Sequence, residues 1–64
     1  MAPTKEDIDT AIALLLANAD DTRLDADVST DPDEAAEFRA VARSYTAVAV
    51  WLEQQLHDGK VGNS

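Results

Sequence analysis

Apolar residues recur three and four positions apart in the first third of the chain, which is the spacing of one face of an α-helix. The positions are Ile8, Ala11, Ile12, Leu15 and Ala19. Thr4 is suited to cap this helix, and Asp7 follows three residues later as in a capping box. The pattern stops at the Asp20-Asp21 pair. We therefore predict a helix over residues 5–19.

A second helical pattern begins with the clearest start signal in the sequence. Asp31 offers a capping side chain, and Pro32 stands at the first helical position. The apolar face that follows consists of Phe38, Val41, Tyr45, Val48, Leu52 and Leu56, flanked by Ala42 and Ala49. Gly59 is suited to end the helix. We predict a helix over residues 32–58.

The intervening residues 20–31 are rich in Asp, Ser and Thr, whose side chains bond to their own backbone and favour turns. This composition predicts an acidic loop, with Leu24 and Val28 turned back onto the helices. Residues 20–37 together hold eight acidic residues and one Arg.

These elements predict an all-α fold: a two-helix hairpin forming one small domain over residues 1–64, with a flexible tail at 60–64. The first predicted helix is too short to cover the second, and both carry apolar side chains outside their main faces. Soluble monomers rarely expose large apolar patches. We therefore expect a homo-oligomer, with a dimer favoured, packed as a four-helix bundle. The expected interface residues are Leu14, Leu16, Phe38, Tyr45, Val48, Val50, Trp51 and Leu52.

Length and charge exclude several classes of function. A 64-residue chain without Cys has neither a disulfide nor a thiolate metal site to stabilise it. A net charge of −8 opposes direct binding to nucleic acid or to an anionic membrane. No apolar run is long enough to cross a bilayer, and no signal peptide is recognisable, so we expect a cytoplasmic protein.

The residues offer no constellation for catalysis or for holding a metal or cofactor, so we expect none of these. His57 is the only imidazole, and no Ser lies in a nucleophile setting. Arg39 and Arg43 form a basic pair one helical turn apart, which is a candidate anion site or a pair neutralised by neighbouring acids. Trp51 belongs either to the oligomer interface or to a surface that anchors a different protein.

The run from Ala47 to Glu53, with Trp51 as its distinctive member, is similar to the last helix of phage anti-CBASS proteins. The polar residues that precede the Trp in that family have no counterparts here. The resemblance implies a small oligomeric hairpin that sequesters cyclic nucleotides. Our main expectation is a protein–protein interaction module, of the regulatory, adaptor or phage-inhibitor type, that binds or masks a partner with a basic surface. A ligand sponge and a structural subunit of a larger assembly, such as a virus particle, are the alternatives.

Overall fold

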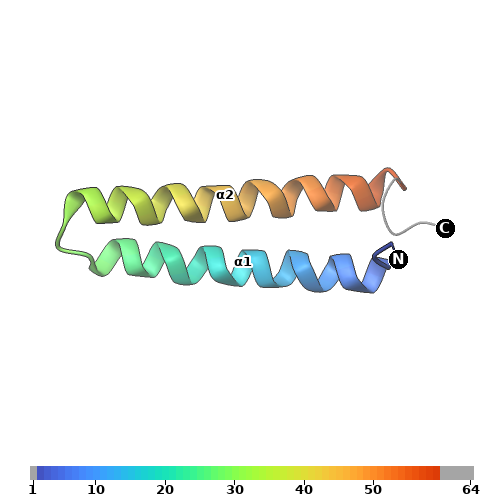
Figure 1. The fold of residues 1–64 in the computed structure, drawn as a ribbon, viewed down its shortest axis with the longest axis horizontal. Helices are drawn as coiled ribbons and strands as arrows, with labels where there is room; N and C mark the ends of the chain where they lie inside the picture. The colour runs from blue at the N-terminus through green and yellow to red at the C-terminus, as the bar shows by residue number, and fades with distance from the viewer. Residues whose placement is uncertain (1, 60–64) are drawn as a thin grey trace.

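The computed structural model describes residues 2–59, which form two antiparallel helices and no strand (Figure 1). Helix α1 spans Lys5–Val28 and helix α2 spans Pro32–His57. They lie side by side as a rod measuring 48 × 18 × 15 Å, with the start of α1 and the end of α2 at the same end. The predicted all-α hairpin is confirmed, whereas the predicted tail at 60–64 lies outside the described residues.

Both helices begin where their capping residues predict. The Thr4 hydroxyl accepts a hydrogen bond from the Asp7 backbone N–H at 3.1 Å, and the Asp7 carboxylate accepts one from the Thr4 N–H at 3.0 Å. The Asp31 carboxylate accepts a bond from the Asp33 N–H at 3.0 Å, directly before Pro32. Each cap satisfies backbone donors that a helix start leaves without partners. At the other end, Gly59 adopts a φ of 73°, as a glycine that follows a helix commonly does.

The predicted long acidic loop is wrong for most of its length, because α1 continues through residues 20–28. Only residues 29–31 connect the helices. Asp and Thr are weak helix formers, but tertiary contacts override such preferences. Leu24 and Val28 also do not turn inward: their exposed fractions are 61% and 76%.

Contacts with α2 explain why this acidic stretch is helical. Ala26 is 2% exposed, so it packs against the second helix although it adds little apolar surface. Arg23 donates a hydrogen bond to the Thr46 hydroxyl at 2.8 Å across the hairpin. The same guanidinium forms an ion pair with Asp20 at 3.0 Å, one turn earlier on α1. The segment is thus held by a small buried side chain and by polar links, which a search for apolar periodicity does not detect.

The seam between the helices follows a seven-residue repeat in which alanine holds the most buried position. Within residues 2–59, the buried residues are Ile8, Ile12, Ala19, Ala26, Ala35, Ala42 and Ala49. Five half-buried residues alternate with them at spacings of three and four: Leu15, Thr22, Phe38, Tyr45 and Leu52. The half-buried Leu56 lies seven residues after Ala49 and continues the alanine position. Such a repeat is the packing pattern of a left-handed coiled coil. Small side chains let the helix axes approach toward the lower end of the usual range, about 8 Å.

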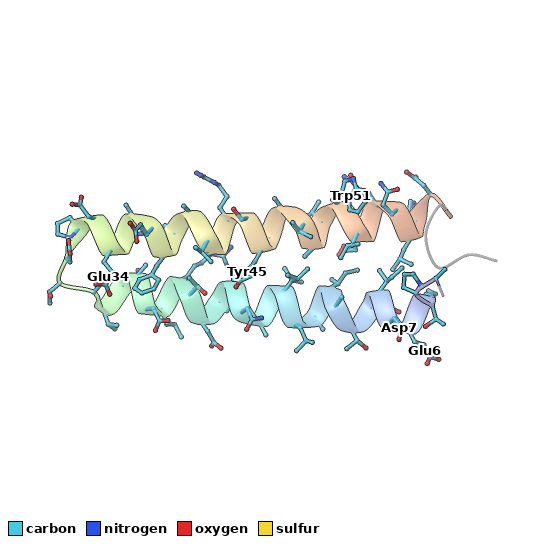
Figure 2. All side chains as sticks on the ribbon, viewed as in Figure 1. Glu6, Asp7, Glu34, Tyr45 and Trp51 are labelled. Atoms are coloured by element: carbon cyan, nitrogen blue, oxygen red, sulfur yellow. The ribbon has the colours of Figure 1, made fainter. Side chains whose placement is uncertain are left out.

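This seam corrects the apolar face that we predicted for the second helix. Val41 and Val48 were expected at its centre, but they are 43% and 47% exposed, and Ala42 and Ala49 take the centre instead. Tyr45 lies between the helices, while Trp51 projects from the side of α2 away from α1 (Figure 2).

The core that results is small for a protein of this length. Its one cluster joins Ile8, Ile12 and Ala49 with the half-buried Leu15, Leu52 and Leu56, all in the half of the rod farthest from the connection. The two helices have 24 and 26 residues, so a length mismatch is not a reason to expect an oligomer. A surplus of apolar surface remains: the exposed large hydrophobic residues are Leu14, Leu16, Leu24, Val28, Val41, Val48, Val50 and Trp51.

Substitution of Leu24 by Pro tests the extended α1. In a helix interior, Pro removes a backbone hydrogen bond and clashes with the preceding turn, so we expect a loss of about 3 kcal/mol in unfolding free energy. Thr30→Pro is the matched control, because Thr30 lies in the connection and Ser29 before it already has an extended ψ of 135°. Urea denaturation measures both losses. Similar small losses would show that residues 20–28 do not need to be helical.

Enlarging a seam alanine tests the close approach of the helices. Ala42→Leu forces extra volume into a filled position, and we expect it to cost about 1–3 kcal/mol. Ala40→Leu is the matched control, since Ala40 is exposed on the same helix. Thermal and urea denaturation compare the two. A stabilising effect of Ala42→Leu would contradict the seam described here.

Candidate interaction surfaces

The two edges of the seam give the hairpin two chemically different flanks. Residues directly before the seam alanines of α2, such as Val41 and Val48, lie along one edge. Residues directly after Phe38 and Tyr45 lie along the other edge, and the hydrogen bond between Thr46 and Arg23 shows that α1 contributes to it.

The first edge is apolar over the middle of the rod and toward the chain ends. We call it the Trp51 flank and define it by Leu14, Val41, Val48 and Trp51, whose exposed fractions are 60%, 43%, 47% and 54%. Helical periodicity places Leu14 of α1 on this edge, in the same half of the rod as Trp51 of α2. The Trp51 flank therefore carries exposed apolar side chains from both helices.

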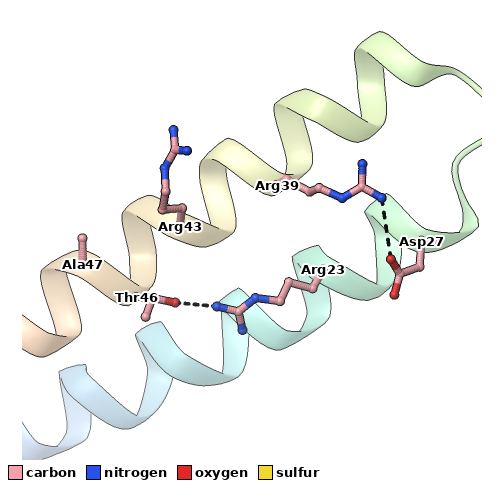
Figure 3. Close-up of a pocket in the computed structure, with 6 residues that line it drawn as sticks. All are labelled: Arg23, Asp27, Arg39, Arg43, Thr46 and Ala47. Carbon is pink, nitrogen blue, oxygen red and sulfur yellow. Dashed lines mark hydrogen bonds and ion pairs between the residues drawn. The ribbon is translucent and has the colours of Figure 1, made fainter.

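The second edge, which we call the arginine flank, is defined by Arg23, Arg39 and Arg43, the only arginines in the chain. They line an open groove of about 590 Å³ together with Asp27, Thr46 and Ala47 (Figure 3). Leu16 and Val50 extend this flank toward the chain ends, by helical periodicity.

The arginines differ in how far neighbouring acids neutralise them. Arg23 contacts Asp20 at 3.0 Å, and Arg39 contacts Asp27 at 3.8 Å across the hairpin. Among residues 2–59, Arg43 has no hydrogen-bond or ion-pair partner, and its side chain points away from α1 (Figure 3). Neutralisation by nearby acids is therefore observed for Arg39 but not for Arg43.

Acidic side chains concentrate at the end of the rod where the helices connect, which we call the loop end. The eight acids of residues 20–37 belong to the second half of α1, the connection and the first turns of α2. At the start of α2 they favour the helix, because Asp33 and Glu34 lie beside the positive end of its dipole. In the last turn of α1, which holds no basic residue, Asp25 and Asp27 face the negative end and disfavour it.

The residues expected at an oligomer interface fall into two groups. Phe38, Tyr45 and Leu52 lie in the seam of their own hairpin, where they are half-buried. The other five are exposed and remain interface predictions: Leu14, Leu16, Val48, Val50 and Trp51. Sequence reasoning missed Arg23 as a neighbour of Arg39 and Arg43, because a loop predicted at residue 23 gave it no place on a helix face.

Comparisons with known proteins add no family to this picture: no protein-family model, curated protein or solved structure matches the chain. Neither α1 nor α2 contains a stretch that is both long enough and apolar enough to cross a membrane.

Two charge reversals test how the loop-end acids act on the helices. Asp25→Lys and Asp33→Lys change the net charge equally, but the first acts at the end of α1 and the second at the start of α2. The dipole favours Lys at the C-terminal end of a helix and disfavours it at the N-terminal end. We therefore expect the Asp25→Lys variant to be more stable than the Asp33→Lys variant by about 1 kcal/mol. Melting temperatures at low salt measure the difference. Equal stabilities would mean that general repulsion, and not the dipole, governs this end.

Proposed function

We propose that this protein is a non-enzymatic protein–protein interaction module of the cytoplasm. It pairs with itself and binds or masks another protein, in the manner of a small regulatory, adaptor or phage-type inhibitor protein. The observation that carries this proposal is the distribution of apolar side chains within residues 2–59: two isoleucines and five alanines are buried, whereas eight large apolar residues are exposed. A hairpin with such a small core gains most from covering its own surface.

The Trp51 flank is the surface best suited to self-association. A standard interface buries about 800 Å² per partner, roughly one sixth of the 4739 Å² that the chain exposes. Trp51, Val48 and Leu14 supply the large aromatic and aliphatic side chains that dominate interface energies. Two hairpins packed along this flank form a four-helix bundle.

Charge favours one orientation of the two hairpins. A parallel pair brings two loop ends together, and with them sixteen acidic residues in place of eight. A two-fold axis at the level of Leu14 and Trp51 instead sends the loop ends to opposite extremes, where salt screens their repulsion over about 8 Å. We therefore propose an antiparallel dimer with an acidic tip at each extreme.

The loop end is the part of this dimer proposed to meet a different protein. Its acids attract a basic surface and speed the encounter through long-range electrostatics. The same charge repels nucleic acid phosphates, so the proposed partner is a basic protein surface.

Two leucine substitutions test the dimer. Leu14 and Leu24 are equally exposed, at 60% and 61%, but only Leu14 belongs to the Trp51 flank. We expect Leu14→Ser to weaken dimerisation at least tenfold, from the lost burial of about 1.5–3 kcal/mol, and Leu24→Ser to leave it unchanged. Sedimentation equilibrium at micromolar concentrations measures both.

Trp51 fluorescence gives an independent readout of the same interface. In the dimer the indole is shielded from water, so emission shifts to the blue on association and Leu14→Ser shifts it back to the red. A stable monomer with red-shifted emission would overturn self-association and assign Trp51 to a surface for another protein.

Photo-crosslinking in the native host tests for this partner. A photo-reactive amino acid replaces Glu34 in one variant and Thr10 in the control variant. Glu34 is at the loop end and Thr10 is near the other end. Crosslinks to one basic protein from position 34 alone, lost in high salt, support the proposal. Equal crosslinking from both positions contradicts it.

A small-ligand sponge remains the second candidate function. One observation favours it: the structure brings Arg23 of α1 into the groove that Arg39 and Arg43 line on α2. Mass spectrometry of small molecules that copurify with the protein tests this function. The third alternative, a structural subunit of a larger assembly, stays a prediction that no feature described above favours.

A further inference from the structure

The placement of the three arginines carries an inference that rests on the second candidate function, the small-ligand sponge, and names the chemical class of its ligand. Arg39 and Arg43 lie one turn apart on α2, a spacing at which like charges repel and destabilise a helix. In the described part of the chain, the Asp27 carboxylate is the one acidic group in an ion pair with either arginine. It lies 3.8 Å from Arg39, and both side chains are more than half exposed. Asp27 therefore neutralises Arg39 in part, and the charge of Arg43 has no ion-pair partner among residues 2–59.

Arg23 supplies an ordered side of the same groove from α1. One of its terminal nitrogens contacts the Asp20 carboxylate at 3.0 Å, and the other donates to the Thr46 hydroxyl at 2.8 Å. The Thr46 hydroxyl in turn donates to the Ala42 carbonyl at 3.0 Å, so this polar chain crosses the seam. Arg23 is thus held in place. Arg39 extends toward Asp27 and Arg43 points away from α1, so these two exposed side chains must turn toward one another to share a ligand (Figure 3).

We infer that this groove binds a phosphate group, free or carried by a small molecule as a monoester, bridged between Arg39 and Arg43. A phosphate dianion removes the repulsion between the two guanidinium groups, whose planar forks match its oxygens. The groove is open and about 590 Å³ in volume, so it holds the anionic group while the remainder of a ligand stays outside. The loop-end acids and the net charge of −8 oppose a polyanion, which restricts the ligand to small phosphates.

The test measures binding of inorganic phosphate and of phenyl phosphate, by NMR shifts of backbone amides at constant ionic strength. Arg43→Gln removes one side of the bridge without breaking a contact within the protein. Lys5→Gln is the control, because it changes the net charge equally at the opposite end of the rod. We expect Arg43→Gln to weaken binding about tenfold and Lys5→Gln less than twofold. Asp27→Asn frees Arg39 and is expected to strengthen binding.

Saturable shifts confined to residues around the groove, lost in Arg43→Gln and kept in Lys5→Gln, support the site. Response to both probes identifies the phosphate group itself as the ligand, and response to phenyl phosphate alone assigns the site to monoesters. Shifts that sodium chloride reproduces, or equal weakening by Arg43→Gln and Lys5→Gln, overturn it. Dimerisation is measured separately on the other flank, so failure of this site leaves the proposed dimer standing.

Discussion

Close approach of two helices through alanine is the constraint on which the rest of this molecule depends. With Ala19, Ala26, Ala35, Ala42 and Ala49 along the seam, the helices pack closely but bury few carbon atoms. The larger apolar side chains are consequently displaced to the edges, where Val41, Val48 and Trp51 remain exposed. A thin, tightly packed hairpin and an apolar outer surface are therefore two results of one choice of residues.

The same constraint distributes charge along the rod. Because alanine supplies little apolar surface, the half of the hairpin near the connection is held by polar links, in which Arg23 and Asp27 take part. The arginines needed for these links gather on one flank, and unpaired acids remain at the loop end. The hairpin thereby separates an apolar region, a basic groove and an acidic tip within 48 Å.

Local signals in the sequence predict the helix starts and the hairpin, because caps act over three or four residues: Thr4, Asp7, Asp31 and Pro32 behave as expected. The extent of α1 was not predictable in this way, since residues 20–28 are helical through contacts with a distant segment. The hydrophobic pattern likewise misplaced the centre of the seam. Close packing requires small side chains there, so Ala42 and Ala49 occupy the centre although Val41 and Val48 have more apolar area. The arginine groove was not predicted, because residue 23 was assigned to a loop. A residue must be placed on a helix before its neighbours across the seam are known.

The short connection has a consequence for how the chain acquires its fold. Contacts near residues 29–31 close the smallest loops and cost the least entropy, so pairing of the helices begins there. That region offers mainly alanines and acids, whereas the apolar cluster joins Ile8 to Leu56, nearly the whole described chain apart. The first contacts between the helices therefore contribute little stabilising free energy, and the contacts of the apolar cluster form last. A nascent chain therefore gains most of its stability only when the final turns of α2, which carry Leu52 and Leu56, have left the ribosome.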